Sequence, residues 1–270
     1  MKTHLQFHAL AILISIASYS QEDTLIVLSV NSDTVRVHVE QYHNPMLRTG
    51  TYEKSSLSVD NFVLDLNTDG QKGKDIETLS HLLTDSFDTD TQKVRAIFYW
   101  MTQNIAYDTK QFHDHKTEKF HCGRKEKYSH AVERWEWERA RNTLIKRKGI
   151  CSDYALLFKY LCDFANVESI VVEGYAANGS KRISTSLGEK ASNHAWNAVW
   201  IDNKPYLLDV TWASGYCDKG VKIFTRQLNE YYYLTPPEDM ILDHHPKNAK
   251  WQFLAFPVGM KRFAAIANGQ

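Results

Sequence analysis

The chain has 270 residues, and its 32 lysines and arginines are balanced by 32 aspartates and glutamates, so the formal net charge is zero. This balance argues against an electrostatic nucleic-acid binder and against a polybasic membrane surface. Aromatic residues make up 12% of the chain and include seven tryptophans, which is typical of a globular protein with a well-filled core.

The first 20 residues have the features of a signal peptide. An apolar run over residues 9–17 ends in Ser18 and Ser20, which place small side chains at the −3 and −1 positions of a cleavage site before Gln21. The run is too short for a permanent anchor, and no later run is long enough to span a membrane. We therefore expect an exported protein, periplasmic or secreted, with a signal peptide at 1–20.

Residues 21–78 are expected to form an N-terminal lead-in segment that packs on the following domain. Alternating apolar residues predict strands at 25–28 and 35–39, with a turn between them. Residues 43–73 are rich in turn formers, and we expect them to be mostly extended.

Helical patterns follow. Residues 75–84 have the apolar spacing of a short helix, and the next helix is expected to begin at a capping aspartate, Asp88 or Asp90. A further helix is predicted at residues 131–146. Its many charged residues are most simply explained as a solvent-exposed face. In the helix that begins at Asp88 or Asp90, the side chains predicted to be buried are Val94, Ile97, Phe98 and Met101.

The segment between Tyr107 and Gly149 is polar and contains several potential metal ligands. Histidine and cysteine are the usual zinc ligands, so a zinc site is one interpretation. The spacing matches no compact zinc motif, and a solvated insertion explains the composition equally well, so we expect no metal. The residues in question are His113, His115, His121, Cys122 and His130.

The stretch around Cys151 organises the rest of the chain. Apolar residues recur at helical spacing from Tyr154 to about Phe164, and Gly149 precedes them as a helix breaker. This pattern places Cys151 at or near a helix N-terminus, where the helix dipole and the free N–H groups favour a thiolate and can bind an oxyanion. Taken alone, a cysteine such as Cys151 is more commonly a small core residue.

Two predicted strands carry the other candidate groups. His194 begins an alternating run that ends near Trp200, and after a turn at residues 202–205 the segment 206–212 reads as the next strand, carrying Asp209. A hairpin would place His194 beside Asp209. An imidazole beside a thiol makes a thiolate–imidazolium pair, and a carboxylate on the other ring nitrogen orients the ring. Singly, each residue has an ordinary structural explanation; together they indicate acyl-transfer chemistry.

These residues resemble the transglutaminase-like superfamily, in a bacterial exported branch similar to the cytokinesis and kyphoscoliosis-peptidase type. The resemblance runs from about Leu79 to Phe253, and we expect the domain to span residues 79–254, with a C-terminal tail at 255–270. It rests on blocks in the family's order: the helix at 91–108, Arg147-Lys148-Gly149-Ile150-Cys151, Asn193-His194-Ala195-Trp196-Asn197, Asp209-Val210-Thr211-Trp212, Tyr231-Tyr232-Tyr233-Leu234, His244-His245-Pro246 and Trp251-Gln252.

The resemblance implies an α+β fold with a papain-like transglutaminase core, in which helices pack on an antiparallel sheet and the cysteine lies at a helix N-terminus. It implies Cys151 as nucleophile, His194 as base, Asp209 as orienting acid and Tyr107 as an oxyanion donor. It implies neither metal nor cofactor.

The expected function is a thiol-dependent acyl-transfer enzyme on peptide or protein amides, cell-wall peptide included, most simply a cysteine peptidase-like hydrolase. A protein-glutamine transglutaminase and a non-catalytic binding module that retains the fold are the alternatives. No nucleic-acid partner is expected.

The remaining cysteines and histidines are given structural roles. Cys162 lies on the apolar side of the cysteine helix and reads as core, whereas Cys122 and Cys217 lie in polar surroundings, where a disulfide between them is an open alternative. Residues 231–234 are expected to form a final core strand. His244 and His245, which follow it, are interpreted as structural, because neither has an evident carboxylate partner on an adjacent strand.

Overall fold

The computed structural model describes residues 25–30, 34–40, 51–68, 70, 73, 75–114, 120, 122–123, 126–177 and 192–268, and up to residue 55 it describes the backbone alone. The signal peptide expected at 1–20 lies outside these ranges. Among the described residues, no helix combines the length and the apolar composition that crossing a bilayer requires.

A four-stranded sheet with the strand order β11-β6-β7-β8 forms one layer of the molecule, and all of its pairings are antiparallel. Strands β7 and β8 are joined by Asp202 and Asn203, whose positive φ angles of 51° and 61° match the two-residue hairpin turn that suits twisted strands. The four strands are β6 (Ser169–Ala176), β7 (His194–Ile201), β8 (Lys204–Leu208) and β11 (His244–Pro246).

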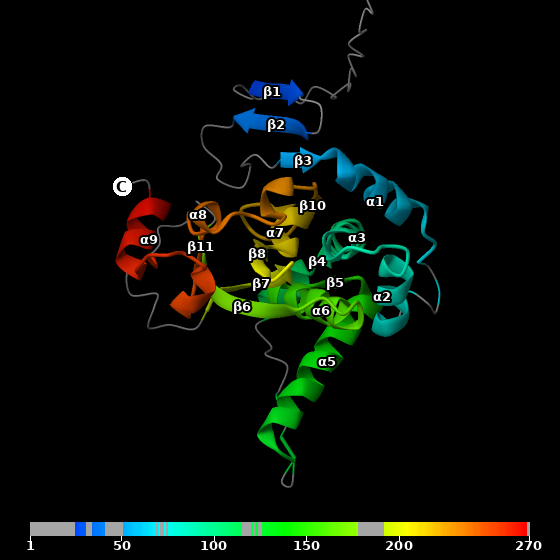
Figure 1. Cartoon of the computed structure of the whole chain (residues 1–270). Coiled ribbons are helices and arrows are strands. Elements are labelled where there is room, and N and C mark those ends of the chain that lie inside the picture. Colours follow the sequence, from blue (N-terminus) through cyan, green and yellow to red (C-terminus); the bar gives the residue numbers. More distant parts are fainter. Residues whose placement is uncertain are drawn as a thin grey trace, which may run out of the picture.

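Helix α6 (Cys151–Phe164) packs on β6 and β7 and is surrounded by α2 (Ile76–Thr84), α3 (Asp90–Asn104) and α5 (Tyr128–Lys146). Figure 1 shows these helices gathered about α6, with α5 projecting away from the body. The α3 side chains that were predicted to be buried are fully buried. The α+β architecture expected from the sequence, with helices on an antiparallel sheet, is confirmed.

The N-terminal strands β1 (Leu25–Val30), β2 (Thr34–Glu40) and β3 (Thr51–Glu53) form a separate antiparallel sheet, which confirms the two predicted strands. The expectation of extended chain up to residue 73 was wrong, because residues 54–65 form α1 (Lys54–Asp65). Val59 and Val63 lie one helical turn apart and are both buried, and α1 packs on α3.

Three local predictions also differ from the structure. The cap of α3 is Thr89, whose hydroxyl accepts the Gln92 N–H, rather than either aspartate. The strand expected to run through residue 212 ends at Leu208, because Asp209 caps a short helix, α7 (Val210–Ser214). The segment expected as a strand at residues 231–234 begins as a 3₁₀ helix, η4 (Glu230–Tyr232).

The remaining elements are short. The last helix, α9, buries Phe263 against Tyr175 and His245, so the C-terminal segment is docked on the sheet. These elements are β4 (Ala106–Tyr107), α4 (Thr109–Asp114), β5 (Lys148–Gly149), β9 (Gly215–Cys217), β10 (Phe224–Arg226), α8 (Pro237–Met240), η5 (Ala249–Gln252) and α9 (Met260–Ala267).

Candidate active site

Cys151 is the first residue of α6 and is half-buried. Ile150 precedes it in extended conformation, and the Ile150 N–H donates to Asp153 Oδ2 at 3.0 Å, which is the reciprocal half of a capping box. As the first helical residue, Cys151 has an N–H with no acceptor inside the helix. The thiol therefore lies at the positive end of α6, where a negative sulfur or an oxyanion is stabilised.

Asp153 ties this helix start to α5 and α4. Its Oδ1 accepts from Arg139 Nε at 2.8 Å and also from Arg139 Nη2, and its Oδ2 accepts from Gln111 Nε2 at 2.8 Å. Arg139 Nη2 also donates to Ser152 Oγ at 2.6 Å. The sequence led us to expect that the charged residues of α5 form a solvated face. This expectation was wrong for Arg139, whose side chain is 12% exposed and pairs with the Asp153 carboxylate, which is 4% exposed.

Gly149 permits the close approach on which this arrangement depends. A Cβ at this position would lie 2.6 Å from the Asp153 Cβ, closer than two carbon atoms can pack. Gly149 also lies in the two-stranded parallel pair of β4 and β5, opposite Tyr107, and its carbonyl accepts the Asp108 N–H at 2.9 Å. Any side chain at Gly149 would therefore displace Asp153 and the helix start.

Replacing Asp153 with alanine is expected to destabilise the protein by about 3 kcal/mol, because it leaves Arg139 buried without its partner. Chemical denaturation measures the free energy of unfolding. The matched control is Asp163→Ala on the same helix, where the ion pair with Lys159 is partly exposed and the expected change is below about 1 kcal/mol. Equal losses in the two variants would contradict the buried-clamp interpretation.

His194 and Asp209 form a buried pair. His194 Nε2 lies 2.6 Å from Asp209 Oδ2, with side chains 7% and 0% exposed. The Cys151 thiol lies close enough to the His194 ring to affect its charge, and since Nε2 faces Asp209, Nδ1 is the nitrogen left for sulfur. Burial disfavours the charged ring, but the carboxylate of Asp209 and the sulfur of Cys151 outweigh it and raise the pKa of His194 to about 10.

Asp209 is positioned by the local chain and by two histidines. As the cap of α7, its Oδ1 accepts the backbone N–H groups of Thr211 at 2.8 Å and Trp212 at 3.1 Å. Its Oδ2 accepts from His194 and from His244 Nε2 at 3.0 Å. Burial opposes the charge, yet these histidines hold the pKa of Asp209 well below its usual range, so the carboxylate is ionised.

Two further side chains hold the parts together. Asn197, fully buried on β7, donates through Nδ2 to the Ala155 carbonyl on α6 at 3.0 Å and to the Ile170 carbonyl on β6 at 3.1 Å. The bond from Asn197 to Ala155 holds the helix that carries Cys151 against the strand that carries His194. The Trp212 ring lies 5.2 Å from the His194 ring, centroid to centroid, and shields the pair from water.

Sequence reasoning missed His244. The interpretation that it has no carboxylate partner was wrong: both ring nitrogens face carboxylates, Nε2 facing Asp209 and Nδ1 facing Asp243 Oδ1 at 2.6 Å. Asp243 is the preceding residue, so half of the arrangement was visible in the sequence. The other half depends on the pairing of β11 with β6, which no local pattern indicates.

His194, Asp209 and His244 bring ligand atoms of the kinds that bind metals within 4.8 Å of one another. The two Nε2 atoms lie 2.6 and 3.0 Å from a single carboxylate oxygen, however, and these are hydrogen-bond distances that fit two N–H donors sharing one acceptor. Hydrogen bonds therefore account for the close approach of these three side chains.

The other sequence candidates are Tyr107, the remaining cysteines and the histidines of the polar segment. Tyr107 is half-buried on β4 across from Gly149, where burial and the nearby sulfur of Cys151 raise its phenol pKa, so the hydroxyl remains a donor. Cys162 is fully buried, which confirms its core role. The four cysteines are all described and all have free thiols, so the Cys122–Cys217 disulfide is not formed. Of the histidines considered for zinc, His115 and His121 lie outside the described residues.

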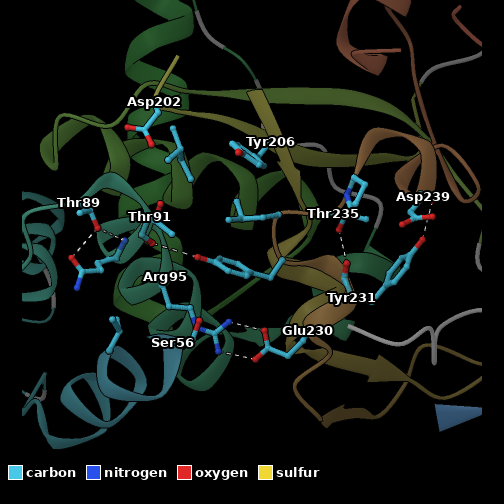
Figure 2. Close-up of a pocket in the computed structure, with 16 residues that line it drawn as sticks. Ser56, Thr89, Thr91, Arg95, Asp202, Tyr206, Glu230, Tyr231, Thr235 and Asp239 are labelled. Carbon is cyan, nitrogen blue, oxygen red and sulfur yellow. Dashed lines mark hydrogen bonds and ion pairs between the residues drawn. The ribbon is translucent and has the colours of Figure 1, made fainter. Parts of the chain in front are cut away.

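A separate cavity of about 700 Å³ is lined by residues of η4 and of the first part of α3. Figure 2 shows Arg95 and Glu230 paired at its edge, with Tyr231 and Thr235 lining it. Arg95 donates to both carboxylate oxygens of Glu230, at 2.6 and 2.7 Å, and also pairs with Asp60, so the charge of its guanidinium is matched internally. Cys151, His194 and Asp209 are not among the residues that line this cavity.

The fold and the cluster define a class of protein, in which a cysteine at a helix N-terminus meets a histidine and an aspartate carried by an antiparallel sheet. Residues 77–210 match the family model described as the transglutaminase-like superfamily. The chain belongs to the transglutaminase-like superfamily.

Among the relatives, the kyphoscoliosis peptidases of Mus musculus and Homo sapiens are each 33% identical over 190 residues, which cover 69% of this chain and 25% of each relative. This chain thus spans about a quarter of the length of those relatives. The crystal structure of a TGase aligns at 14% identity over 57% of this chain and 32% of its own, with a TM-score of 0.33, which is too remote to carry an argument.

Proposed function

We propose that the protein is a thiol-dependent acyl-transfer enzyme that cleaves peptide or protein amides as a cysteine peptidase-like hydrolase. The observation that carries the proposal is the buried pair of His194 and Asp209, 2.6 Å apart, with the ring near a thiol at the N-terminus of α6. A non-catalytic binding module has no need of this costly desolvated arrangement.

In the proposed reaction each group has a defined role. The Cys151 thiolate attacks the amide carbonyl, and the N–H of Cys151 together with the hydroxyl of Tyr107 donates to the oxyanion. The tetrahedral intermediate collapses, the C–N bond breaks, and imidazolium Nδ1 of His194 gives its proton to the leaving amine. Water then attacks the thioester while His194 accepts its proton, and the acid product leaves as Cys151 regains the thiolate form. Asp209 holds the ring in place throughout.

Hydrolysis rather than amine transfer is supported by the name peptidase carried by the two relatives from Mus musculus and Homo sapiens. An amine in place of water would give a transglutaminase, and the same three side chains serve both reactions. Substrates are proposed to be protein or peptide amides, cell-wall peptide included. Export to the periplasm or the medium is proposed from the apolar run and the small residues before Gln21.

Iodoacetamide is expected to label Cys151 rapidly at about pH 6.5, where an ordinary thiol with a pKa of about 8.5 is almost entirely protonated. His194→Ala should slow this labelling at least about tenfold, because the thiolate loses its counter-ion. The matched control is His81→Ala, an exposed histidine on α2 that pairs with Asp85. Labelling at the rate of an ordinary thiol in the unaltered protein would contradict the proposal.

The nature of the second reactant is decided by product masses. Peptide amides are incubated with the protein, with and without a primary amine such as glycine ethyl ester. A hydrolase gives the free acid in both mixtures, whereas a transglutaminase gives the amine conjugate when the amine is present. A protein with reactive Cys151 that forms neither product from any amide would support the binding-module alternative.

A further inference from the structure

The pair of His194 and Asp209 is the inner part of a longer buried chain. From Asp209 Oδ2 the chain continues through His244 Nε2 at 3.0 Å, His244 Nδ1 to Asp243 Oδ1 at 2.6 Å, and Asp243 Oδ2 to the hydroxyl of Tyr232 at 3.0 Å. The side chains of His244, Asp243 and Tyr232 are at most 2% exposed. Hydrogen bonds in such surroundings are strong, and each unsatisfied group is costly.

The protonation of His244 follows from its partners. A neutral imidazole has one donor and one acceptor nitrogen, but both nitrogens of His244 face carboxylate oxygens. Although burial disfavours the charged ring, the charge of Asp243 and the bonds to Asp209 and Asp243 raise the pKa of His244. The hydroxyl of Tyr232 donates to the other oxygen of Asp243. His244 therefore donates in both directions.

The aromatic neighbours keep His244 in this orientation. The Trp212 ring meets the His244 ring edge to face with centroids 4.6 Å apart, and the Trp196 ring does so at 5.0 Å. Both tryptophans also contact the ring of His194, at 5.2 and 6.1 Å respectively. The two histidines thus share one aromatic enclosure, with Asp209 between them.

We infer that His244 is a positioning residue of the proposed reaction: it donates Nε2–H to Asp209 Oδ2, and Asp243 and Tyr232 hold it in that role. Without this bond the carboxylate keeps its two backbone donors but is free to turn its second oxygen away from His194. The inference rests on the proposed function, since it concerns how the Cys151–His194 pair is kept aligned.

The test measures iodoacetamide labelling of Cys151 across a pH series in two variants. His244→Phe removes both donors and is expected to slow labelling at about pH 6.5 by roughly 10- to 100-fold, the range found for side chains that orient reactive groups through a hydrogen bond. His244→Gln keeps an N–H near the Nε2 position and should stay within about threefold of the unaltered protein.

The matched control is His245→Phe. His245 is the next residue of β11, is also buried, and bonds to the Val258 carbonyl instead of a carboxylate. This variant should label as the unaltered protein does. A folded His244→Phe variant that labels at the unaltered rate, or a His244→Gln variant as slow as His244→Phe, would overturn the positioning role. Slow labelling of the unaltered protein would instead contradict the proposed function itself.

A second measurement keeps the inference testable if His244→Phe fails to fold. Imidazole ¹⁵N resonances of the unaltered protein, assigned by comparison with His244→Gln, should show both nitrogens of His244 protonated at neutral pH. Tyr232→Phe removes a single hydroxyl and should shift these His244 resonances without unfolding the protein. An unprotonated Nε2 in His244 would overturn the inference, because that atom would then have no proton to donate to Asp209.

Discussion

Replacing Cys151 with serine is expected to lower kcat/KM for peptide amides by about 10⁴-fold or more, the usual consequence of removing a nucleophile. The serine hydroxyl keeps its place at the start of α6, but it ionises far less readily than a thiol beside an imidazolium. The oxyanion donors and the bound geometry remain, so any residual rate reports their contribution alone. Steady-state kinetics with peptide amides measures the change.

The control for that experiment is Cys122→Ser, which alters an exposed free thiol outside the cluster. Its kcat/KM should equal that of the unaltered protein. If Cys151→Ser retained most of its activity, amide cleavage would not pass through a thioester at this sulfur, and the assignment of the nucleophile would be wrong.

Asp209→Asn is expected to lower kcat/KM by about 10³- to 10⁴-fold and to destabilise the protein by about 2 kcal/mol. All four contacts of the carboxylate are with donors: two backbone N–H groups at Oδ1 and two histidines at Oδ2. The NH₂ group of an asparagine must face either the two backbone N–H groups or the two histidines. In either orientation a donor group faces other donors, and hydrogen bonds are lost. Kinetics and chemical denaturation measure the two effects.

Asp209→Asn is also expected to change the pH dependence of the reaction. Because the pKa of His194 is raised from 6.5 to about 10, the charged ring contributes stability that is complete below about pH 6.5 and lost as pH rises through about 10. The alkaline limb of kcat/KM should lie near pH 10, and it should move toward neutral pH in Asp209→Asn. The control is Asp202→Asn in the β7–β8 turn, where asparagine suits the positive φ and no change is expected. An unmoved alkaline limb in Asp209→Asn would show that the carboxylate does not set the ionisation of His194.

The parts of the site that sequence reasoning could place are those with a local or strongly periodic signal. Apolar residues at helical spacing after Gly149 predicted α6 and put Cys151 at its start. Alternation from His194 onward and a two-residue turn predicted the β7–β8 hairpin, and with it the neighbourhood of His194 and Asp209. Family resemblance added the order of the blocks.

What sequence reasoning could not place depends on contacts between distant segments. His244 meets Asp209 because β11 returns to the edge of β6, whereas its own neighbourhood in the sequence contains only its other partner, Asp243, and a short proline-ended strand. Arg139 looked like any other charge on α5, since its partner lies in the first turn of α6. Helix α1 was hidden because its few apolar residues gain their burial from packing against distant segments, α3 among them.

The placement of Cys162 has a practical consequence. It shares α6 with Cys151, but its side chain is fully buried and burial raises its thiol pKa, so it cannot react while the helix stays packed. Peptide mapping after alkylation would therefore yield two signals from one helix: modification at Cys151 measures reactivity, and modification at Cys162 records loss of native structure. Each substitution at the site can thus be sorted into a chemical or a folding defect within a single sample.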